Sequence, residues 1–174
     1  MAASITLDDV YKARRVINRH LPRTPLIHSS ALSKKLGFES YVKCENVLPT
    51  GAFKVRGGIN LVSRLSDEEK RSGVIAASTG NHGQSIAYAA SKFGIRAVIG
   101  MPENSNPDKV EAIKNFGAFV KFHGSDFDEA RTWVEEEAKR KGYRYIHSAN
   151  EPLLIAGVGT LYLEIMEDIP EVDA

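Results

Sequence analysis

One lysine stands in a segment that suits covalent chemistry. Lys54 follows Phe53 in the run from Pro49 to Gly58, where glycine and alanine leave little bulk around its amine. Burial disfavours the ammonium form of a lysine, and the neutral amine is the nucleophile that attacks a carbonyl carbon to form a Schiff base. Most lysines are solvated surface residues. The setting of this one favours an enzyme that uses an aldehyde cofactor.

A loop of small polar residues is the second candidate feature. Hydroxyl groups and backbone N–H groups at the start of a helix suit a carboxylate, and Asn81 offers its amide to a cofactor oxygen. His82 fits an acid–base role and fits equally a helix-start residue. Without Lys54, the loop would be explained as a strand-to-helix turn with Asn81 as the N-cap. The loop residues are Ser78, Thr79, Gly80, Asn81, His82 and Gly83.

Short apolar strands alternate with capped helices in the second part of the chain. This alternation predicts parallel strands joined by right-handed helical crossovers, which form an open α/β sheet. Ligands in such sheets bind beyond the carboxyl ends of the strands, where loops lead into helices. We therefore expect the polar loop at a binding site. The expected strands are 74–77, 95–100, 118–122 and 143–147, and the expected helices are 82–93, 107–116 and 126–141.

The N-terminal part of the chain predicts shorter elements. Thr6 can cap a first helix, and extended pieces at 24–27 and 39–44 flank a short helix near 30–35. Cys44 follows apolar residues and is interpreted as a core thiol. Gly157 and Gly159 lack the third glycine of a dinucleotide-binding turn, so helix packing explains them better.

Composition excludes several classes of function. The net charge is +1, which gives no electrostatic footprint for nucleic acid or for an anionic membrane surface. No apolar run approaches the ~18 residues of a membrane span. A single cysteine fits a reducing compartment, so we expect a cytoplasmic protein, and no metal-ligand spacing is present.

Two motifs in register resemble a known family. Residues 43–57 and 78–84 resemble the fold-type II pyridoxal-phosphate enzymes, in particular the serine/threonine dehydratase and serine racemase branch. Residues 101–103, 106–109 and 156–160 keep the order and spacing of that family. The resemblance covers about residues 5–174. It implies pyridoxal 5′-phosphate as the cofactor and an amino acid as the substrate.

The resemblance also implies roles for individual residues. Lys54 would hold the cofactor as a Schiff base and move the substrate's α-proton, Phe53 would pack against the cofactor ring, and Asn81 would hydrogen-bond a ring oxygen. Thr79 takes the place where racemising relatives commonly carry a serine base. It keeps a hydroxyl but adds a methyl group, which favours α,β-elimination over racemisation. The residues expected around the substrate carboxylate are Ser78, Thr79, Gly80, Asn81 and His82.

The resemblance further implies a division of the chain. Residues 56–148 would form a small parallel α/β domain with helices on both faces, and residues 1–55 and 149–174 would form part of a larger domain. The family's glycine loop for the cofactor phosphate has no counterpart here. We therefore expect the N-terminal half of a hydroxy-amino-acid ammonia-lyase, as a homo-oligomer or with a complementing C-terminal half.

Other functions stay open at this point. A non-catalytic remnant or interaction module would keep the same fold without holding the cofactor. Within the family, an amino-acid racemase and a β-replacement enzyme are the alternatives. Serine, threonine and a hydroxyaspartate all remain candidate substrates.

Overall fold

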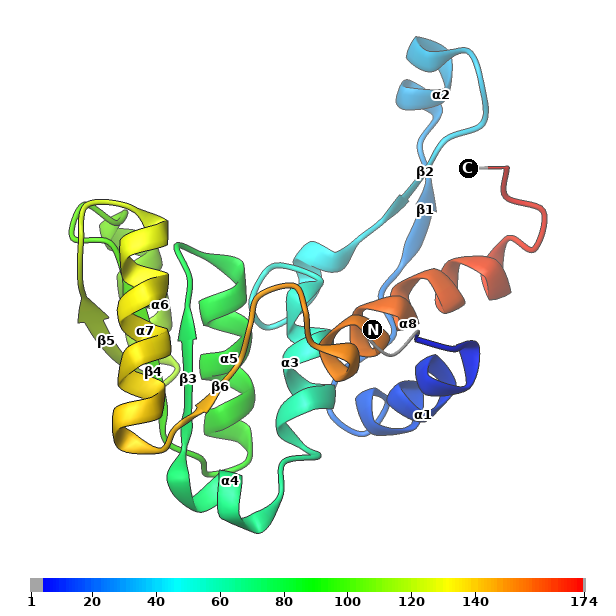
Figure 1. The fold of residues 1–174 in the computed structure, drawn as a ribbon. Helices are drawn as coiled ribbons and strands as arrows, with labels where there is room; N and C mark the ends of the chain where they lie inside the picture. Colours follow the sequence, from blue (N-terminus) through cyan, green and yellow to red (C-terminus); the bar gives the residue numbers. More distant parts are fainter. Residues whose placement is uncertain (1–4, 174) are drawn as a thin grey trace.

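The centre of the fold is a parallel sheet of four strands in the order β5-β4-β3-β6 (Figure 1). The computed structural model describes residues 5–173. Every residue of β3 and β4 is buried, as expected for strands covered on both faces. The strands are β3 (Val74–Ala77), β4 (Ala97–Met101), β5 (Phe119–Phe122) and β6 (Arg144–Tyr145).

Alternate residues of β3 point into two different apolar clusters. Val74 and Ala76 join the larger cluster, to which α5 and α6 contribute, while Ile75 and Ala77 join the smaller cluster with α7. Helices therefore cover both faces of the sheet, which confirms the predicted fold class (Figure 1). These helices are α5 (Asn81–Lys92), α6 (Pro107–Asn115) and α7 (Phe127–Lys141).

The predicted elements exist, with small shifts at their ends. The fourth strand is the most reduced, since only Arg144 and Tyr145 pair with β3. Asp126, and not Ser125, is the N-cap of α7, and its carboxylate accepts a hydrogen bond from the backbone N–H of Glu129. Ser125 instead donates to the Glu129 carboxylate.

Helix α3 (Lys54–Val62) lies between α5 and α8 (Pro152–Asp168) and approaches both closely. A Cβ atom on Gly58 would come within 2.3 Å of Ser85 Oγ and 2.7 Å of Ser85 O, so only glycine fits there. A Cβ on Gly157 would come within 2.7 Å of Arg56 O, which supports a helix-packing role for this glycine. Helix α1 (Leu7–Ile17) packs on α8, and α4 (Asp67–Ser72) leads into β3.

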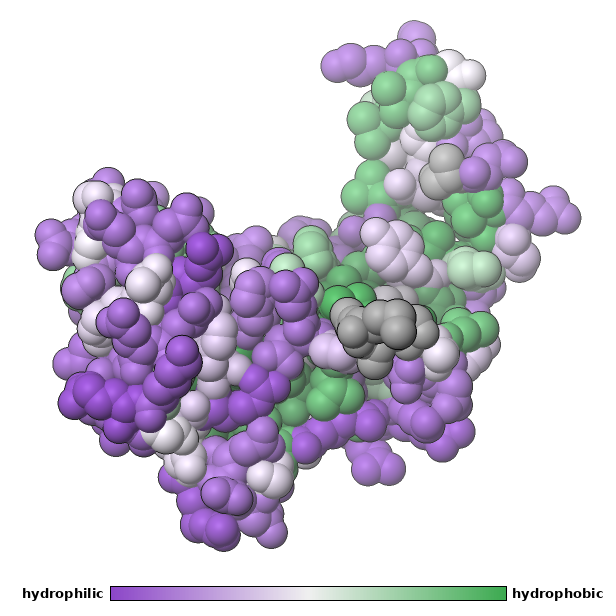
Figure 2. Space-filling view, viewed as in Figure 1, coloured by the Kyte–Doolittle hydropathy of each residue, from purple (hydrophilic) through white to green (hydrophobic). Residues whose placement is uncertain are grey.

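An arm projects from this body (Figure 1). It consists of β1 (Leu26–His28), α2 (Ser30–Leu36) and β2 (Tyr41–Lys43), with β1 and β2 antiparallel. Figure 2 shows apolar surface on the arm, whereas the sheet side of the molecule is mostly hydrophilic. Cys44 is half-buried and donates weakly to Val42 O, so its interpretation as a core thiol was wrong.

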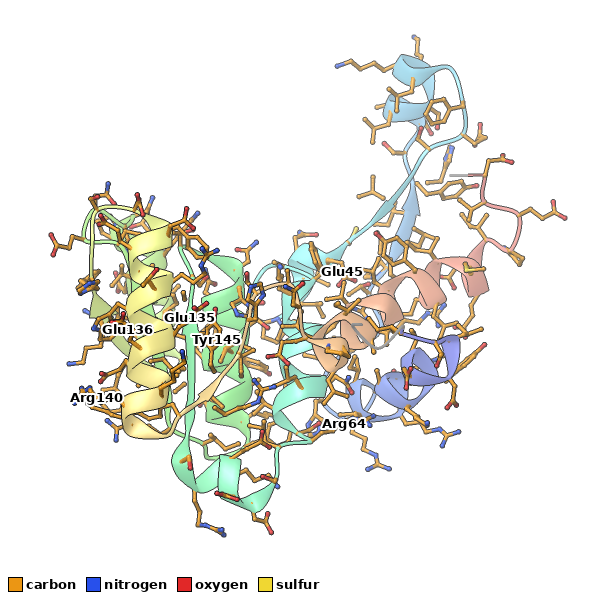
Figure 3. All side chains as sticks on the ribbon, viewed as in Figure 1. Glu45, Arg64, Glu135, Glu136, Arg140 and Tyr145 are labelled. Atoms are coloured by element: carbon orange, nitrogen blue, oxygen red, sulfur yellow. The ribbon has the colours of Figure 1, made fainter. Side chains whose placement is uncertain are left out.

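A buried ionic cluster fastens the base of the arm to the body. Arg56 of α3 is fully buried and binds both carboxylate oxygens of Glu45, in η1 (Glu45–Val47), at 2.8 Å each. It also binds Glu164 of α8 at 2.7 and 3.0 Å. Lys43 reaches Glu164 at 2.7 Å, so two cations face two carboxylates. Figure 3 shows Glu45 where the arm meets the body.

Candidate active site

The strand order places a crevice between β3 and β6. The chain runs outward from β3 to β4 and β5, then returns to the other side of β3 at β6. Loops that leave neighbouring strands at such a reversal diverge and open a binding crevice beyond the carboxyl ends. A cleft of about 320 Å³ lies there. It is lined by Lys54, Ala77, Ser78, Thr79, Gly80, Asn81, His82, Lys109, Phe127 and Ser148.

The local backbone fixes the position of Lys54, and the lysine side chain reaches into this cleft. It is the first residue of α3, and the preceding turn uses Gly51 at a φ of 63°, a conformation that favours glycine. The hydroxyl of Ser85 donates to the Lys54 carbonyl at 2.6 Å. The Lys54 amine lies 3.4 Å from Ser148 O, just beyond β6. The amine is therefore held between the starts of α3 and α5 and the segment after β6.

The loop after β3 is held by one hydroxyl. Ser78 Oγ accepts hydrogen bonds from the backbone N–H groups of Gly80 at 3.0 Å and Gly83 at 2.8 Å. This leaves the exposed side chains of Thr79 and Asn81 free to meet a ligand. Asn81 is the first residue of α5 and Gly80 is its N-cap, so the simple N-cap explanation of Asn81 does not apply.

His82 is a buried base at the edge of the cleft. His82 is only 6% exposed, and its Nε2 lies 3.4 Å from Ile146 O. Within residues 5–173 its Nδ1 has no hydrogen-bond partner. Burial lowers the pKa of His82 to about 4, and the positive charge of Lys54 acts in the same direction. The ring is therefore neutral at pH 7.

The cleft gathers most of the residues that the sequence singled out. Lys54 and the whole stretch Ser78–His82 line it, whereas Phe53 is 40% exposed and is not among the lining residues. The sequence reasoning missed Lys109, Phe127 and Ser148. These follow the carboxyl ends of β4, β5 and β6, so applying the strand-end rule to every strand could have found them.

The residues present fit an aldehyde cofactor bound with an amino acid. The cleft offers an amine and a loop with exposed Thr79 and Asn81, and within residues 5–173 the adjoining His82 has a buried Nδ1 without a partner. A Cβ on Gly80 would stand 3.4 Å from Lys109 Nζ, so Gly80 and Lys109 are neighbours in the wall of the cleft. Size alone does not identify the site, because a hollow of about 580 Å³ beside α7 is larger and has no lysine among its lining residues.

The family follows from a profile match over most of the chain. The profile described as pyridoxal-phosphate dependent enzyme matches residues 17–174. The chain belongs to the pyridoxal-phosphate dependent enzyme family. Its pyridoxal-phosphate lysine and cleft residues remain predictions from the motifs and the geometry.

Similar sequences include enzymes named for threonine. The chain is 45% identical over 169 residues to an L-threonine ammonia-lyase of Thermotoga maritima, covering 97% of this chain and 42% of that protein. It is 42% identical over 166 residues to a catabolic L-threonine dehydratase of Staphylococcus aureus, covering 95% of this chain and 48% of the relative. The chain thus spans less than half the length of these curated relatives.

Solved structures with the same fold include one named a serine racemase and one named a threonine deaminase. Maize serine racemase superposes with a TM-score of 0.92 at 34% identity, covering 99% of this chain and 52% of that one. A threonine deaminase of Solanum lycopersicum superposes with a TM-score of 0.86 at 32% identity, covering 99% of this chain and 49% of that one.

Residues 5–173 contain neither a membrane-spanning helix nor a cluster of metal ligands. No helix in that range is both long enough and apolar enough to cross a membrane. Over the same range, no group of three or more His, Cys, Asp or Glu side chains is arranged to hold a metal ion.

Proposed function

We propose that this chain supplies the lysine and the carboxylate-binding loop of an ammonia-lyase that acts on serine- or threonine-like hydroxy amino acids. The observation that carries the proposal is the meeting of Lys54 and the Ser78–His82 loop in one cleft, although Ser78 follows Lys54 by 24 positions in the sequence. The names of the relatives support the same reaction class.

The residues predicted from the sequence have separate tasks in this reaction. The bound cofactor supplies an electron sink for the electrons left at the α-carbon. Lys54 would hold the cofactor covalently through its amine until the substrate amine displaces it, and the freed Nζ would then accept the α-proton. Phe53 packs against the cofactor ring and Asn81 donates its amide to a ring oxygen. The loop holds the substrate carboxylate, with the first backbone N–H groups of α5 as donors.

Ser78 differs from its neighbours in this assignment. Its hydroxyl already accepts two backbone hydrogen bonds within the loop. It therefore supports the substrate site by holding the loop in shape, while Thr79 and Asn81 present exposed side chains. This arrangement keeps the loop ready to bind before a ligand arrives.

Racemisation is the second candidate within the family. Thr79 lines the cleft with Lys54 and carries a hydroxyl, and several structures with the same fold are named racemases. The methyl group of Thr79 favours elimination. Thr79→Ser should raise any racemase activity relative to lyase activity, as measured by chiral chromatography of L-serine reactions.

Partners and location complete the proposal. The exposed apolar surface of the arm and of α8 supports a homo-oligomer or a complementing C-terminal half. Tyr162 and Met166 of α8 are 63% and 58% exposed. We place the protein in the cytoplasm, on the single cysteine and the metabolic character of the reaction.

The test begins with cofactor loading. Pyridoxal phosphate should give the full chain a visible absorption band, and Lys54→Ala should abolish it. Lys114→Ala, an exposed lysine of α6, is the matched control and should keep the band. A loaded chain should then release ammonia and a keto acid from L-serine or L-threonine.

If pyridoxal phosphate gives the chain no visible absorption band, the alternative of a non-catalytic remnant is favoured. If mixing with the C-terminal half of a relative then restores the band, the chain is one half of an enzyme. If no band forms in either case, the proposed function is wrong and the non-catalytic interaction module replaces it.

A further inference from the structure

Lys109 is a cation in the Lys54 cleft to which the proposed reaction gives no task. It lines the cleft from α6, whereas Lys54 belongs to α3. A Cβ on Gly80 would stand 3.4 Å from Lys109 Nζ and 3.5 Å from Lys109 Cδ, so the outer part of this side chain lies beside the loop after β3. Within residues 5–173, no carboxylate forms an ion pair with the Lys109 amine.

The place of Lys109 in its helix does not favour stability. Lys109 is the third residue of α6, directly after the N-cap Asn106 and two further residues. The helix dipole is positive at this end, so cations are disfavoured in the first turn and favoured in the last. Lys114, in the last turn of the same helix, has the favourable placement. Residues that break such a local rule are expected at functional sites.

The charges that line the cleft call for an anionic partner. In the described part of the chain, Lys54 and Lys109 are its only charged lining residues, because His82 is neutral at pH 7 and no Asp or Glu lines it. In the proposed reaction the Lys54 amine is committed to the cofactor and to the α-proton. Lys109 is then the cation that remains for the substrate. The anion that an amino acid brings is its α-carboxylate, which the proposed function places on the loop beside Lys109.

We propose that the ammonium group of Lys109 is the counter-ion of the substrate α-carboxylate at the Ser78–His82 loop. This rests on the proposed function, since it assumes an amino acid in the Lys54 cleft. The loop supplies donors of fixed direction, and Lys109 adds the opposite charge, which makes the contact stronger than a neutral hydrogen bond. Lys109 is a substrate-binding residue that forms no covalent bond and moves no proton.

The first measurement needs no cofactor. Acetate is the carboxylate probe, and acetamide is the uncharged probe of nearly the same shape. The amide signals of Gly80 and Asn81 in proton–nitrogen correlation spectra of the full chain report binding of either probe. Lys109→Met should weaken acetate binding roughly two- to fivefold at low salt and leave acetamide binding unchanged. Lys114→Met is the matched control and should bind acetate as wild type does, since Lys114 is exposed outside the cleft.

Charge is separated from shape in the same titration. Lys109→Arg keeps the cation and should keep most of the acetate affinity, whereas Lys109→Gln should lose as much as Lys109→Met. Added salt should weaken acetate binding more in wild type than in Lys109→Met, because screening acts on the ion pair. Loop amides that do not respond to acetate overturn the inference, and so do equal acetate affinities in wild type and Lys109→Met.

The cofactor phosphate is the other anionic group that would enter the cleft. The place of the Lys109 amine beside Gly80, in the loop assigned to the carboxylate, favours the carboxylate. Loading separates the two sources, because Lys109→Met should bind pyridoxal phosphate as tightly as wild type when the visible band is titrated. Weaker loading of Lys109→Met together with unchanged acetate binding would assign Lys109 to the phosphate and overturn the inference.

The loaded chain gives a kinetic measurement. The α-carboxylate keeps its charge from substrate to keto acid, so Lys109 stabilises the bound substrate and the transition state alike. Lys109→Met should therefore raise the KM for L-serine roughly two- to tenfold and change kcat by less than about twofold. Lys114→Met should change neither. A fall in kcat at unchanged KM would overturn the inference.

The proposed function fails in a different way from this inference. Absence of the visible cofactor band would count against Lys54 as the cofactor lysine. The acetate titration still decides the role of Lys109 in that case, because it is read from the chain without cofactor. Conversely, a loaded and active chain whose acetate affinity does not depend on Lys109 would leave the proposed function intact and remove Lys109 from carboxylate binding.

Discussion

Each residue of β3 and β4 is buried, whereas Ile27, Tyr41 and Val42 of the arm are 52%, 46% and 40% exposed. Both regions use apolar strand residues, but only the sheet has helices on its two faces. The sheet unit, residues 74–145, is therefore covered on both faces, and its larger cluster continues into α1, α3 and α8. The arm, residues 26–43, presents apolar side chains that nothing else in the described chain covers.

This difference separates what the chain can do alone from what needs a partner. The loop of the cleft starts at a strand of the complete sheet unit, so its shape depends on local packing and on Ser78. The arm resembles one side of a protein–protein interface. Its exposed apolar surface is the part that a second copy or a complementing half would cover.

The largest expected effect lies where the base of the arm joins α3 and α8. Arg56→Met removes the cation that Glu45 binds and leaves the buried Glu164 paired with Lys43. Removing one partner of a buried pair typically costs about 3–5 kcal/mol, and we expect that loss in the free energy of unfolding by urea denaturation.

Arg140→Met is the matched control for this joint. Arg140 pairs with Glu137 on α7, and its side chain is 66% exposed. An exposed pair contributes about 0–1 kcal/mol. Equal losses at Arg56 and Arg140 would show that the buried cluster does not fasten the arm to the body.

The same substitution in the two regions tests the comparison directly. Ile75→Ala in β3 should lower the free energy of unfolding by about 2–5 kcal/mol, because Ile75 is fully buried. Ile27→Ala in β1 should change it by less than about 0.5 kcal/mol, because its side chain is already in water. Similar losses at both positions would mean that the arm is covered in solution, for example by a second copy.

Acid should weaken the folded chain through His82. The pKa is about 4 in the folded chain against an ordinary value of 6.5. Between these pH values the unfolded chain binds the extra proton, so the free energy of unfolding falls as the pH falls, by about 3 kcal/mol in total. Lys54 and His147 disfavour the charged ring, and Glu151 favours it.

Comparing wild type with His82→Gln separates the contribution of His82 to the pH dependence from that of the carboxylates. The pH dependence of stability in wild type minus that in His82→Gln should show the fall between pH 6.5 and 4. A flat difference over that window would place the pKa of His82 near its ordinary value and the ring in contact with water.

Charge placed on the arm should affect association more than stability. Ile27→Lys combined with Val42→Lys should leave the free energy of unfolding within about 1 kcal/mol, since both side chains are exposed. The same change should reduce concentration-dependent association, measured by analytical ultracentrifugation. Unchanged association would mean that copies of the chain do not meet through the arm.

The sequence predicted the sheet unit better than the arm or the joint. The short apolar run between capped helices predicted the bounds of β3. The rule that ligands bind beyond the carboxyl ends of strands predicted that the Ser78–His82 loop lies at the site. Arg56 could not be predicted as a buried residue, because its partners Glu45 and Glu164 come from distant segments. Cys44 was misjudged because the arm has no second face of side chains to bury it.

Within the site, the sequence predicted residue types better than contacts. Lys54 and Asn81 were chosen from motifs, and the structure brings both to the cleft. The neighbouring Ser148 was missed, because its approach to Lys54 depends on β6 returning beside β3. No local pattern records that long-range pairing. The division into residues 56–148 and the flanking segments remains a prediction.

The contact between Gly58 and Ser85 has a consequence for redesign. Ser85 touches α3 at Gly58 and donates to the carbonyl of Lys54, so the helix that carries the amine and the helix that follows the loop form one rigid support. An engineer who wants a wider cleft for bulkier substrates cannot shift either helix alone. The adjustable walls are Phe127 and Lys109, whose side chains come from helices outside this contact.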